Sequence, residues 1–256
     1  MTTPLDPGLG LSQPEPEASP SAQRRRPRRV LFVALITLGV LLIAAGGAAL
    51  GRELTRKATP AEAAAALQQE IASRWERLPA GKIFPATVSY SDVAGNKMVA
   101  RLVGIAPPAS CRAALAPAGY ALVRGAGCET ILRATYVDAS GALATTVAVA
   151  VLRSPPSTVQ ASNIAAAASP GLGLHAVTFD GTVADQFGDA AGGTEGSALA
   201  GSYVLLYTAG FTDGLPGAAA AAQANELMAL GSGIDADIRS ILTRHGKPCE
   251  MKDITC

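Results

Sequence analysis

The sequence predicts an α+β fold, an antiparallel sheet of about six strands built from hairpins with helices packed on one face, preceded by one transmembrane helix. Three observations lead to this prediction. Residues 30–50 are apolar and carry no charge. Two segments that begin at Ile83 and Ile131 have the pattern of β-hairpins, and helical patterns lie before, between and after them. We expect a disordered cytoplasmic tail at 1–29, a transmembrane helix at 30–50, a juxtamembrane linker at 51–58 and an extracytoplasmic domain at 59–256.

The N-terminal tail is rich in Pro, Ser, Glu and Gly and has almost nothing apolar to bury, which is typical of disorder. Five arginines precede the apolar run directly: Arg24, Arg25, Arg26, Arg28 and Arg29. Fewer basic residues follow it. Because the larger basic cluster stays on the cytoplasmic side, we expect a cytoplasmic N-terminus, a single crossing of the cell membrane and an outer C-terminal domain. The same arginines suit anionic lipid headgroups.

The apolar run has 21 residues. At about 1.5 Å per residue, a helix of that length covers the ~30 Å hydrocarbon core of a bilayer. A cleavable signal peptide has a shorter apolar region behind a short basic start, whereas more than twenty residues precede the basic cluster here. We therefore expect an uncleaved signal-anchor. Cleavage after the small residues at 44–49 is the alternative.

The outer part is almost neutral. Of the 21 basic and 20 acidic residues of the chain, five and three lie in the tail, which leaves 16 basic and 17 acidic residues outside it. This balance gives no reason to expect nucleic acid or a strongly anionic partner. About 200 residues suffice for one domain, or two small ones, with a sizeable core.

All four cysteines, Cys111, Cys128, Cys249 and Cys256, lie in the outer part. In an oxidising compartment an even number indicates two structural disulfides, for which three connectivities exist. We favour Cys111 with Cys128 and Cys249 with Cys256, because each pair closes a short loop. The spacings do not match a zinc motif, and there is no C-x-x-C redox motif.

The outer domain begins with a helix expected from Thr59 to Leu78. Thr59 can cap it, and a proline and a glutamate follow at suitable positions. Apolar residues recur at every fourth position, at Leu67, Ile71 and Trp75. This stripe predicts that Trp75 packs in a core and does not serve as a ligand platform.

The two hairpin segments resemble each other. Without gaps, at an offset of 48, they match at nine of 28 positions, including a double proline at the end of each. Alanine and valine are abundant, so chance is the alternative to a true repeat. The last strand of the second segment is apolar on both faces, which predicts a central strand covered on both sides. An alanine-rich stretch that suits a short helix follows each hairpin.

A looser third unit completes the domain. The segments HAVTFDG (175–181) and SYVLLYTAGF (202–211) have the pattern of strands, with a long Gly- and Asp-rich loop at 180–201 between them. A helix is expected at 216–246, broken near 231–233 by the Gly-Ser-Gly sequence. It ends where His245 and Gly246 precede a proline.

Sequence motifs of catalysis are missing: there is no G-x-S-x-G, H-E-x-x-H, S-x-x-K or P-loop. Residues 171–176 fit G-x-G-x-x-[GA] but precede no helix, so we expect no nicotinamide cofactor. His245 suits a helix C-terminus, and His175 is expected in a strand or core. The loop acids could bind calcium, but their spacing misses the EF-hand template and favours a solvated loop: Asp180, Asp185, Asp189 and Glu195. No catalytic, cofactor-binding or metal site is therefore predicted.

The basic tail, single apolar run and cysteine-bearing, alanine-rich outer part together resemble single-pass envelope proteins of actinobacteria. In outline the outer part is also similar to the two-disulfide sensor domains of mycobacterial membrane serine/threonine kinases, although no kinase domain is present. The anchor, the cysteines, the nearly neutral outer part and the missing catalytic motifs lead us to expect a tethered domain without catalytic activity that binds a protein, peptide or envelope component. The rival hypothesis is an envelope enzyme whose active site is assembled from sequence-distant residues, for example acids around His175.

Overall fold

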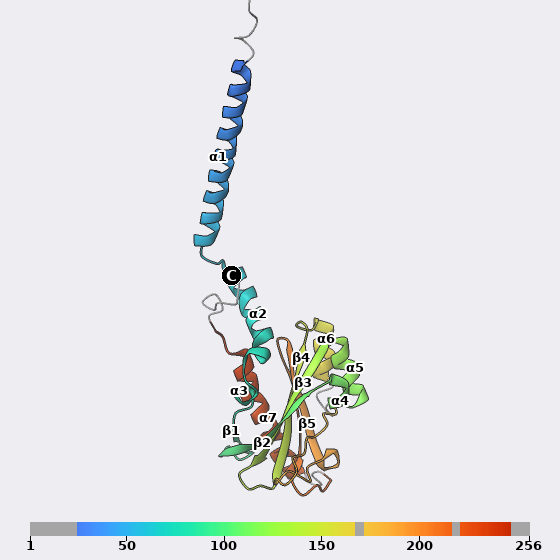
Figure 1. Ribbon diagram of the computed structural model, residues 1–256. Helices are drawn as coiled ribbons and strands as arrows, with labels where there is room; N and C mark the ends of the chain where they lie inside the picture. The colour runs from blue at the N-terminus through green and yellow to red at the C-terminus, as the bar shows by residue number, and fades with distance from the viewer. Residues whose placement is uncertain (1–24, 167–171, 217–220, 247–256) are drawn as a thin grey trace, which may run out of the picture. The chain divides into compact units, whose positions relative to one another are not determined.

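The computed structural model describes residues 25–166, 172–216 and 221–246. The chain forms two compact units, Met1–Lys57 and Ala58–Cys256, and each is described by itself. The first unit contains one helix, α1 (Arg25–Thr55). The second contains a six-stranded sheet with helices around it (Figure 1). The predicted α+β class, the antiparallel sheet and the preceding apolar helix are confirmed.

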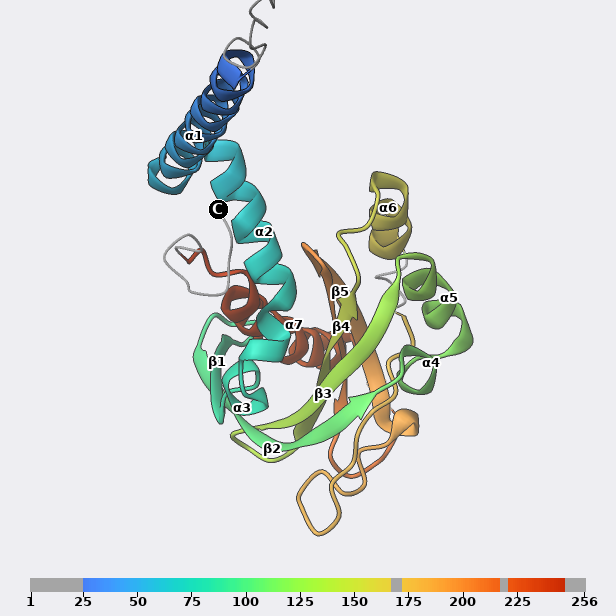
Figure 2. The same ribbon diagram turned by 45° about the horizontal axis from the view of Figure 1, so that its top comes forward.

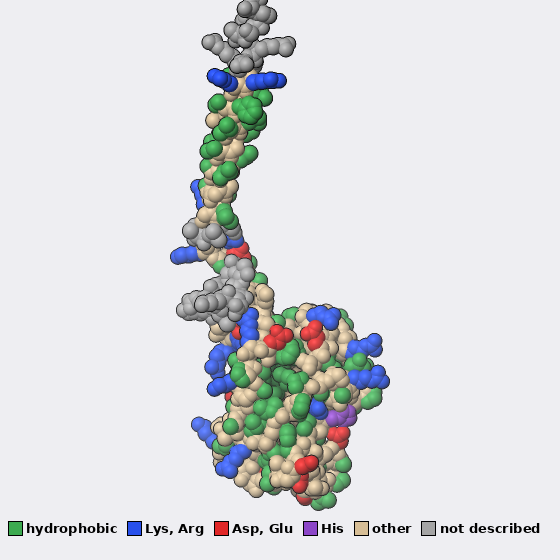
Figure 3. Space-filling view, viewed as in Figure 1, with side chains coloured by type: hydrophobic (Ala, Val, Ile, Leu, Met, Phe, Trp, Pro, Cys, Tyr) green, Lys and Arg blue, Asp and Glu red, His purple; other side chains and the backbone are tan. Residues whose placement is uncertain are grey.

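The apolar part of α1 extends from Arg28 to Arg52 and is long and apolar enough to cross a membrane. Its large side chains are more than half exposed, and none of the span is buried inside the unit. Figure 3 shows these hydrophobic side chains along the helix, with basic side chains beside them. No polar face interrupts the run, so this helix has the composition of a lipid-facing segment and not that of a core helix.

The sheet of the second unit is antiparallel throughout, in the order β1-β2-β3-β4-β6-β5. Both hairpin segments of the sequence form hairpins in this one sheet, as predicted: β1 with β2, and β3 with β4. Their double prolines differ, because the first lies inside β2 and the second follows the end of β4. The strands are β1 (Thr87–Ser91), β2 (Lys97–Ala109), β3 (Cys128–Asp138), β4 (Leu143–Leu152), β5 (Gly192–Ala200) and β6 (Tyr203–Phe211).

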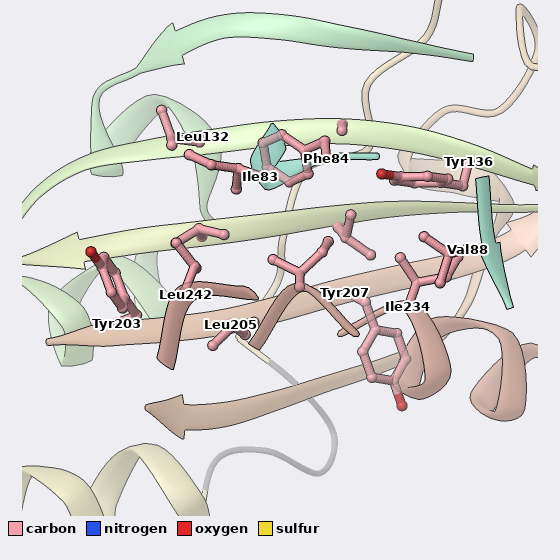
Figure 4. Packing of buried hydrophobic residues seen from close by; sticks show 14 of the residues in the cluster. Ile83, Phe84, Val88, Leu132, Tyr136, Tyr203, Leu205, Tyr207, Ile234 and Leu242 are labelled. Atoms are coloured by element: carbon pink, nitrogen blue, oxygen red, sulfur yellow. The ribbon is translucent and has the colours of Figure 1, made fainter. Parts of the chain in front are cut away.

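One side of the sheet, here called the α7 face, is covered by α2 (Pro60–Arg77), α3 (Ala80–Ile83) and α7 (Ala221–Thr243) (Figure 2). Aromatic and aliphatic side chains from these helices and from the strands form the largest core cluster (Figure 4). The predicted stripe of α2 faces this cluster, with Ile71 buried in it and Leu67 and Trp75 packed against it. The predicted start of α2 is also confirmed, because Thr59 and Glu62 form a capping box.

The opposite side, here called the disulfide face, is covered by α4 (Cys111–Ala114), α5 (Pro117–Gly125), α6 (Thr158–Ala166) and the segment 172–191. The sequence predicted helices on one face of the sheet, and the structure has them on both. The reason is visible in β4, which is buried along almost its whole length. A strand apolar on both sides needs a cover on each of them.

Helix α7 continues without a break through Gly231 and Gly233, where the sequence predicted an interruption. A Cβ atom at Gly231 would lie 2.2 Å from Cδ2 of Tyr207, and one at Gly233 would lie 2.5 Å from Cβ of Tyr90. These glycines therefore allow the helix to approach two tyrosines of the sheet. Close packing compensates for their low helix propensity.

The stretch 175–211, which follows the two hairpin segments, differs from its prediction in the position of one strand. Residues 175–181 pair with no strand of the sheet, and β5 lies in the stretch predicted as a loop. The 175–181 segment crosses the disulfide face because threonine hydroxyls of the sheet bind its backbone: Thr146 accepts from the Val177 amide (2.9 Å) and Thr135 donates to the Val177 carbonyl (2.6 Å). Strand β6 is confirmed.

Candidate functional site

The arginines predicted to set the topology belong to the first unit. Arg28 begins the apolar span, Arg29 follows it in the same helix, and Arg25 and Arg26 belong to the first turn of α1. Arg24 lies outside the described residues. The helix thus carries basic residues directly before its apolar part, which is the arrangement on which the topology prediction rests.

Cys111 and Cys128 form a disulfide that joins the first residue of α4 to the first residue of β3, with a Cα–Cα distance of 6.3 Å. This pairing was predicted. Cys111 is buried in the core cluster of the disulfide face, and Cys128 packs against it. Cys249 and Cys256 lie outside the described residues, so their pairing stays a prediction.

The acids of the predicted loop do not converge on one point. Asp180 and Asp185 are exposed, whereas Asp189 and Glu195 bind backbone amides of the segment that precedes them. In the described part of the chain no three His, Cys, Asp or Glu side chains come together to hold a metal ion.

The rival hypothesis of the sequence analysis placed acids around His175, and the structure has Asp189 beside it. The Nδ1 atom of His175 lies 2.7 Å from Oδ2 of Asp189, whose Oδ1 accepts from the Ala176 amide. Their side chains are 41% and 58% exposed. Among the hydrogen bonds that the structure describes, the His175 ring makes this one. Together with the Ala176 amide contact, the pair holds the 172–176 segment.

Glu195 supports the same segment from β5. Its carboxylate accepts from the Gly173 amide at 2.8 Å. Burial raises the pKa of Glu195, the Gly173 hydrogen bond opposes this shift, and the negative charge of Asp189 adds to it. Gly173 belongs to the glycine pattern considered for a dinucleotide site, and its amide is already bound to a carboxylate. The described residues directly after this pattern form neither a helix nor the expected strand.

A groove between β5 and α7 is the strongest candidate for a functional site. Its volume is about 360 Å³. Strand β5 contributes four consecutive residues, 195–198, so the groove runs along the edge of the strand and not over one of its faces. The lining residues from the other elements are Tyr207, Met228, Ser232, Asp235 and Arg239.

Asp235 is the most unusual group in this groove. It is only 6% exposed, and its Oδ1 atom has no hydrogen-bond partner among the residues that the structure describes. Burial raises the pKa of Asp235 to about 7, and the positive charge of Arg239 opposes this shift. Arg239 is exposed and forms no ion pair with Asp235 within 4 Å in the described part of the chain. A buried acid with a displaced pKa in a groove is typical of a functional position.

Tyr207 forms the floor of the groove. Its ring fits between β5 and α7 because both neighbours are glycines: a Cβ at Gly196 would lie 2.5 Å from the ring, and one at Gly231 would lie 2.2 Å from it. Figure 4 shows the hydroxyl of Tyr207 directed away from the other labelled core side chains. Burial raises the pKa of Tyr207, and the charge of Asp235 adds to the shift. The phenol and the acid therefore lie within electrostatic reach of each other.

The outer edge of β5 offers backbone groups. Strand β5 is the last strand of the sheet, and among the described residues its one strand partner is β6. Ala200 and Tyr203 flank a two-residue hairpin loop, so they form a hydrogen-bonded pair. Alternation then directs the amides and carbonyls of Glu195, Ser197 and Leu199 away from β6. The edge also lacks the prolines and lysines that natural edge strands use against unwanted pairing.

Two features of the sequence concealed this groove. Asp235 flanks the apolar stripe of α7, where a charged residue is expected to reach solvent. The glycines of β5 reduce its strand propensity, which concealed the edge. Comparisons of the chain with protein-family models, curated proteins and solved structures find no match.

Proposed function

We propose that the protein is a single-pass, membrane-anchored binding domain of the cell envelope, with residues 1–29 in the cytoplasm and residues from 59 onward outside it. Support for the anchor comes from the length and apolarity of the helix between Arg28 and Arg52. Support for the orientation comes from the arginines before it. The disulfide between Cys111 and Cys128 is of the kind that persists in an oxidising compartment.

The ligand of this domain is a partner protein, peptide or envelope component that occupies the groove between β5 and α7. One observation carries this assignment: in the described part of the chain, a strand paired on one side only lies beside a groove that contains a buried carboxylate with an unpaired oxygen. Buried polar groups in folded proteins almost always have partners, and a ligand in the groove would supply the one that this oxygen needs. The domain has no catalytic role in this proposal.

The orientation is tested with reporter fusions at the C-terminus. We expect activity from a reporter that works outside the cytoplasm and none from one that works inside. Activity of the cytoplasmic reporter alone would refute the proposed topology.

The binding site is tested by photo-crosslinking in cells that produce the full chain. A photoreactive amino acid replaces Met228, which is exposed and lines the groove, or Val159, which is exposed on α6 and serves as the control. We expect a discrete adduct from position 228 and none from position 159. Equal labelling from both positions would contradict the assignment of the groove.

A second pair of variants isolates the strand edge. Ser197→Pro removes an amide that points away from β6, which an edge strand tolerates, and Ser197→Ala retains this amide. The Ser197 hydroxyl has no partner, so its loss alone leaves the ladder intact. We expect the adduct at position 228 to disappear in Ser197→Pro and to persist in Ser197→Ala. An adduct that survives the proline would exclude the edge of β5 from the binding site.

A further inference from the structure

We infer that the groove receives an extended polypeptide, which pairs with β5 as a seventh strand and carries a lysine or arginine that forms an ion pair with Asp235. This inference rests on the proposed function and names its ligand class. Two independent features of the groove lead to it, the spacing of the free backbone groups and the position of the unpaired acid.

The first feature is the spacing of the edge. The outward amides and carbonyls belong to Glu195, Ser197 and Leu199, every second residue of the strand. Another β-strand presents donors and acceptors with the same two-residue repeat of about 6.8 Å. Recognition by strand addition uses these main-chain bonds for affinity and side-chain pockets for selectivity. The edge thus matches a polypeptide backbone better than a sugar or a lipid.

The second feature is the chemistry of the groove beside the edge. On the α7 face β5 presents Gly196 and Ala198, which have little or no side chain and leave room for the side chains of an added strand. Met228 has a flexible thioether that adapts to different apolar neighbours. A volume of about 360 Å³ accommodates side chains and not a folded domain.

The unpaired carboxylate oxygen of Asp235 favours a ligand that carries a cation. From α7 the facing charged group is Arg239, which forms no ion pair with it in the described residues, and from β6 the facing group is the neutral phenol of Tyr207. From β5 the nearest acid is Glu195, but its carboxylate binds the Gly173 amide on the disulfide face. Oδ1 of Asp235 is therefore without a donor, and a lysine or arginine of the incoming strand supplies one.

The test uses the full chain in nanodiscs and phage-displayed random peptides of nine residues, the length of β5. Selected peptides are then synthesised, and their affinities are measured at pH 8 by fluorescence anisotropy. We expect a lysine or arginine at one shared position of the selected peptides. We also expect Asp235→Asn to weaken binding about tenfold, a difference of the size typical of one charged hydrogen bond.

A second, matched peptide turns the comparison into a double-mutant cycle between Asp235 and the peptide cation. In the second peptide, norleucine replaces the shared cation. The wild-type chain should bind this peptide more weakly than the cationic one. Asp235→Asn should bind both peptides with equal affinity. N-methylation of alternate peptide amides should abolish binding without any change in the protein. This second measurement keeps the strand pairing testable where Ser197→Pro lowers the amount of folded protein.

The contrary outcomes are distinct. Selected peptides without a shared cation, or with equal affinity for Asp235→Asn, overturn the ion pair, while the proposed binding function stands. Peptides that tolerate N-methylation at every position overturn the strand addition. Self-association of the wild-type chain that Ser197→Pro abolishes would make a second copy the occupant. No selected peptide, together with no adduct at position 228, overturns the proposed function itself.

Discussion

The two faces of the sheet are covered by different means. On the α7 face a helix of 23 residues packs directly on aromatic and aliphatic side chains of the strands. On the disulfide face the helices have four, nine and nine residues, and a disulfide and side-chain hydrogen bonds hold the remaining cover. Short helices have little intrinsic stability, so a face covered by them needs covalent and polar connections. A long helix needs only close packing.

Asp235 is a costly polar group of the α7 face, and its replacement is expected to have the largest effect. Burial raises the pKa of Asp235 to about 7 from its ordinary value of 3.8. The folded state therefore holds the proton more tightly than the unfolded state. The contribution of the protonated Asp235 to the free energy of unfolding is fully present below the pKa that this group has in the unfolded state. It is lost as the pH rises through the pKa of the folded state.

Asp235→Asn removes this dependence. A pKa difference of one unit between the folded and unfolded states corresponds to about 1.4 kcal/mol. The raised pKa of Asp235 should therefore make the variant more stable than the wild type by on the order of 4 kcal/mol above pH 7. Below about pH 4 the two proteins should melt alike. Thermal melts of the full chain in detergent from pH 4 to 9 measure the difference. Asp237→Asn on the same helix is the control, and a stability difference for Asp235→Asn that does not change with pH would contradict the argument.

The disulfide face should depend on its covalent link. Cys111→Ser opens a loop with a sequence separation of 17 residues, for which chain entropy gives a loss of about 3 kcal/mol. The variant also leaves Cys128 with a free thiol, so Cys111→Ser/Cys128→Ser is the control. Denaturant unfolding measures the loss. A smaller loss is expected for Cys256→Ser, because the predicted loop from Cys249 is shorter, and equal losses would refute this ranking.

The close approach of α7 should be sensitive to a single methyl group. Gly231→Ala places a Cβ about where the Tyr207 ring lies, at 2.2 Å from Cδ2. We expect a loss of about 2 kcal/mol, within the usual range for overpacking. Gly125→Ala in α5 is the matched control, since its Cβ meets nothing within 4 Å. Its higher helix propensity should leave stability equal or slightly increased. A loss of stability in both variants would show that helix geometry, and not the Tyr207 contact, causes the effect.

The sequence predicted those elements whose causes are local. The capping residues of α2 and the alternation of the hairpins depend on neighbours within a few positions, and the pairing of Cys111 with Cys128 was chosen because it closes a short loop. The errors concern residues whose role depends on distant partners. Gly231 belongs to a Gly-Ser-Gly stretch that predicts a break in the helix. In the structure it allows close contact between α7 and Tyr207, which lies on another element.

The candidate site was not predicted for the same reason. Neither the edge of β5 nor the acid beside it has a local signature, because the groove forms only where the first strand of a hairpin meets a helix from further along the chain. Residues 175–181 show the opposite case. Their composition favours a strand, but the hydroxyls of Thr135 and Thr146 bind their backbone and hold them across the face.

The smallest expected effect concerns these hydroxyls. Thr135 donates to the Val177 carbonyl, so the contact of 2.9 Å between Thr135 and Thr146 must use the hydrogen of Thr146. The oxygen of Thr146 then accepts from the Val177 amide. Thr146 is fully buried. Thr146→Val therefore leaves one buried amide without an acceptor and one hydroxyl oxygen without a donor.

We expect Thr146→Val to lower the free energy of unfolding by about 1 to 2 kcal/mol, the usual cost of unpaired buried groups. Thr146→Ser keeps the hydroxyl and should restore most of the protection at Val177, although it loses a methyl group. Amide hydrogen exchange locates the effect, which should appear as faster exchange at Val177 with little change in β4 or β6. Unchanged protection of Val177 in Thr146→Val would show that packing alone holds the segment. The disulfide face would then resemble the α7 face, and the contrast between them would rest on the disulfide.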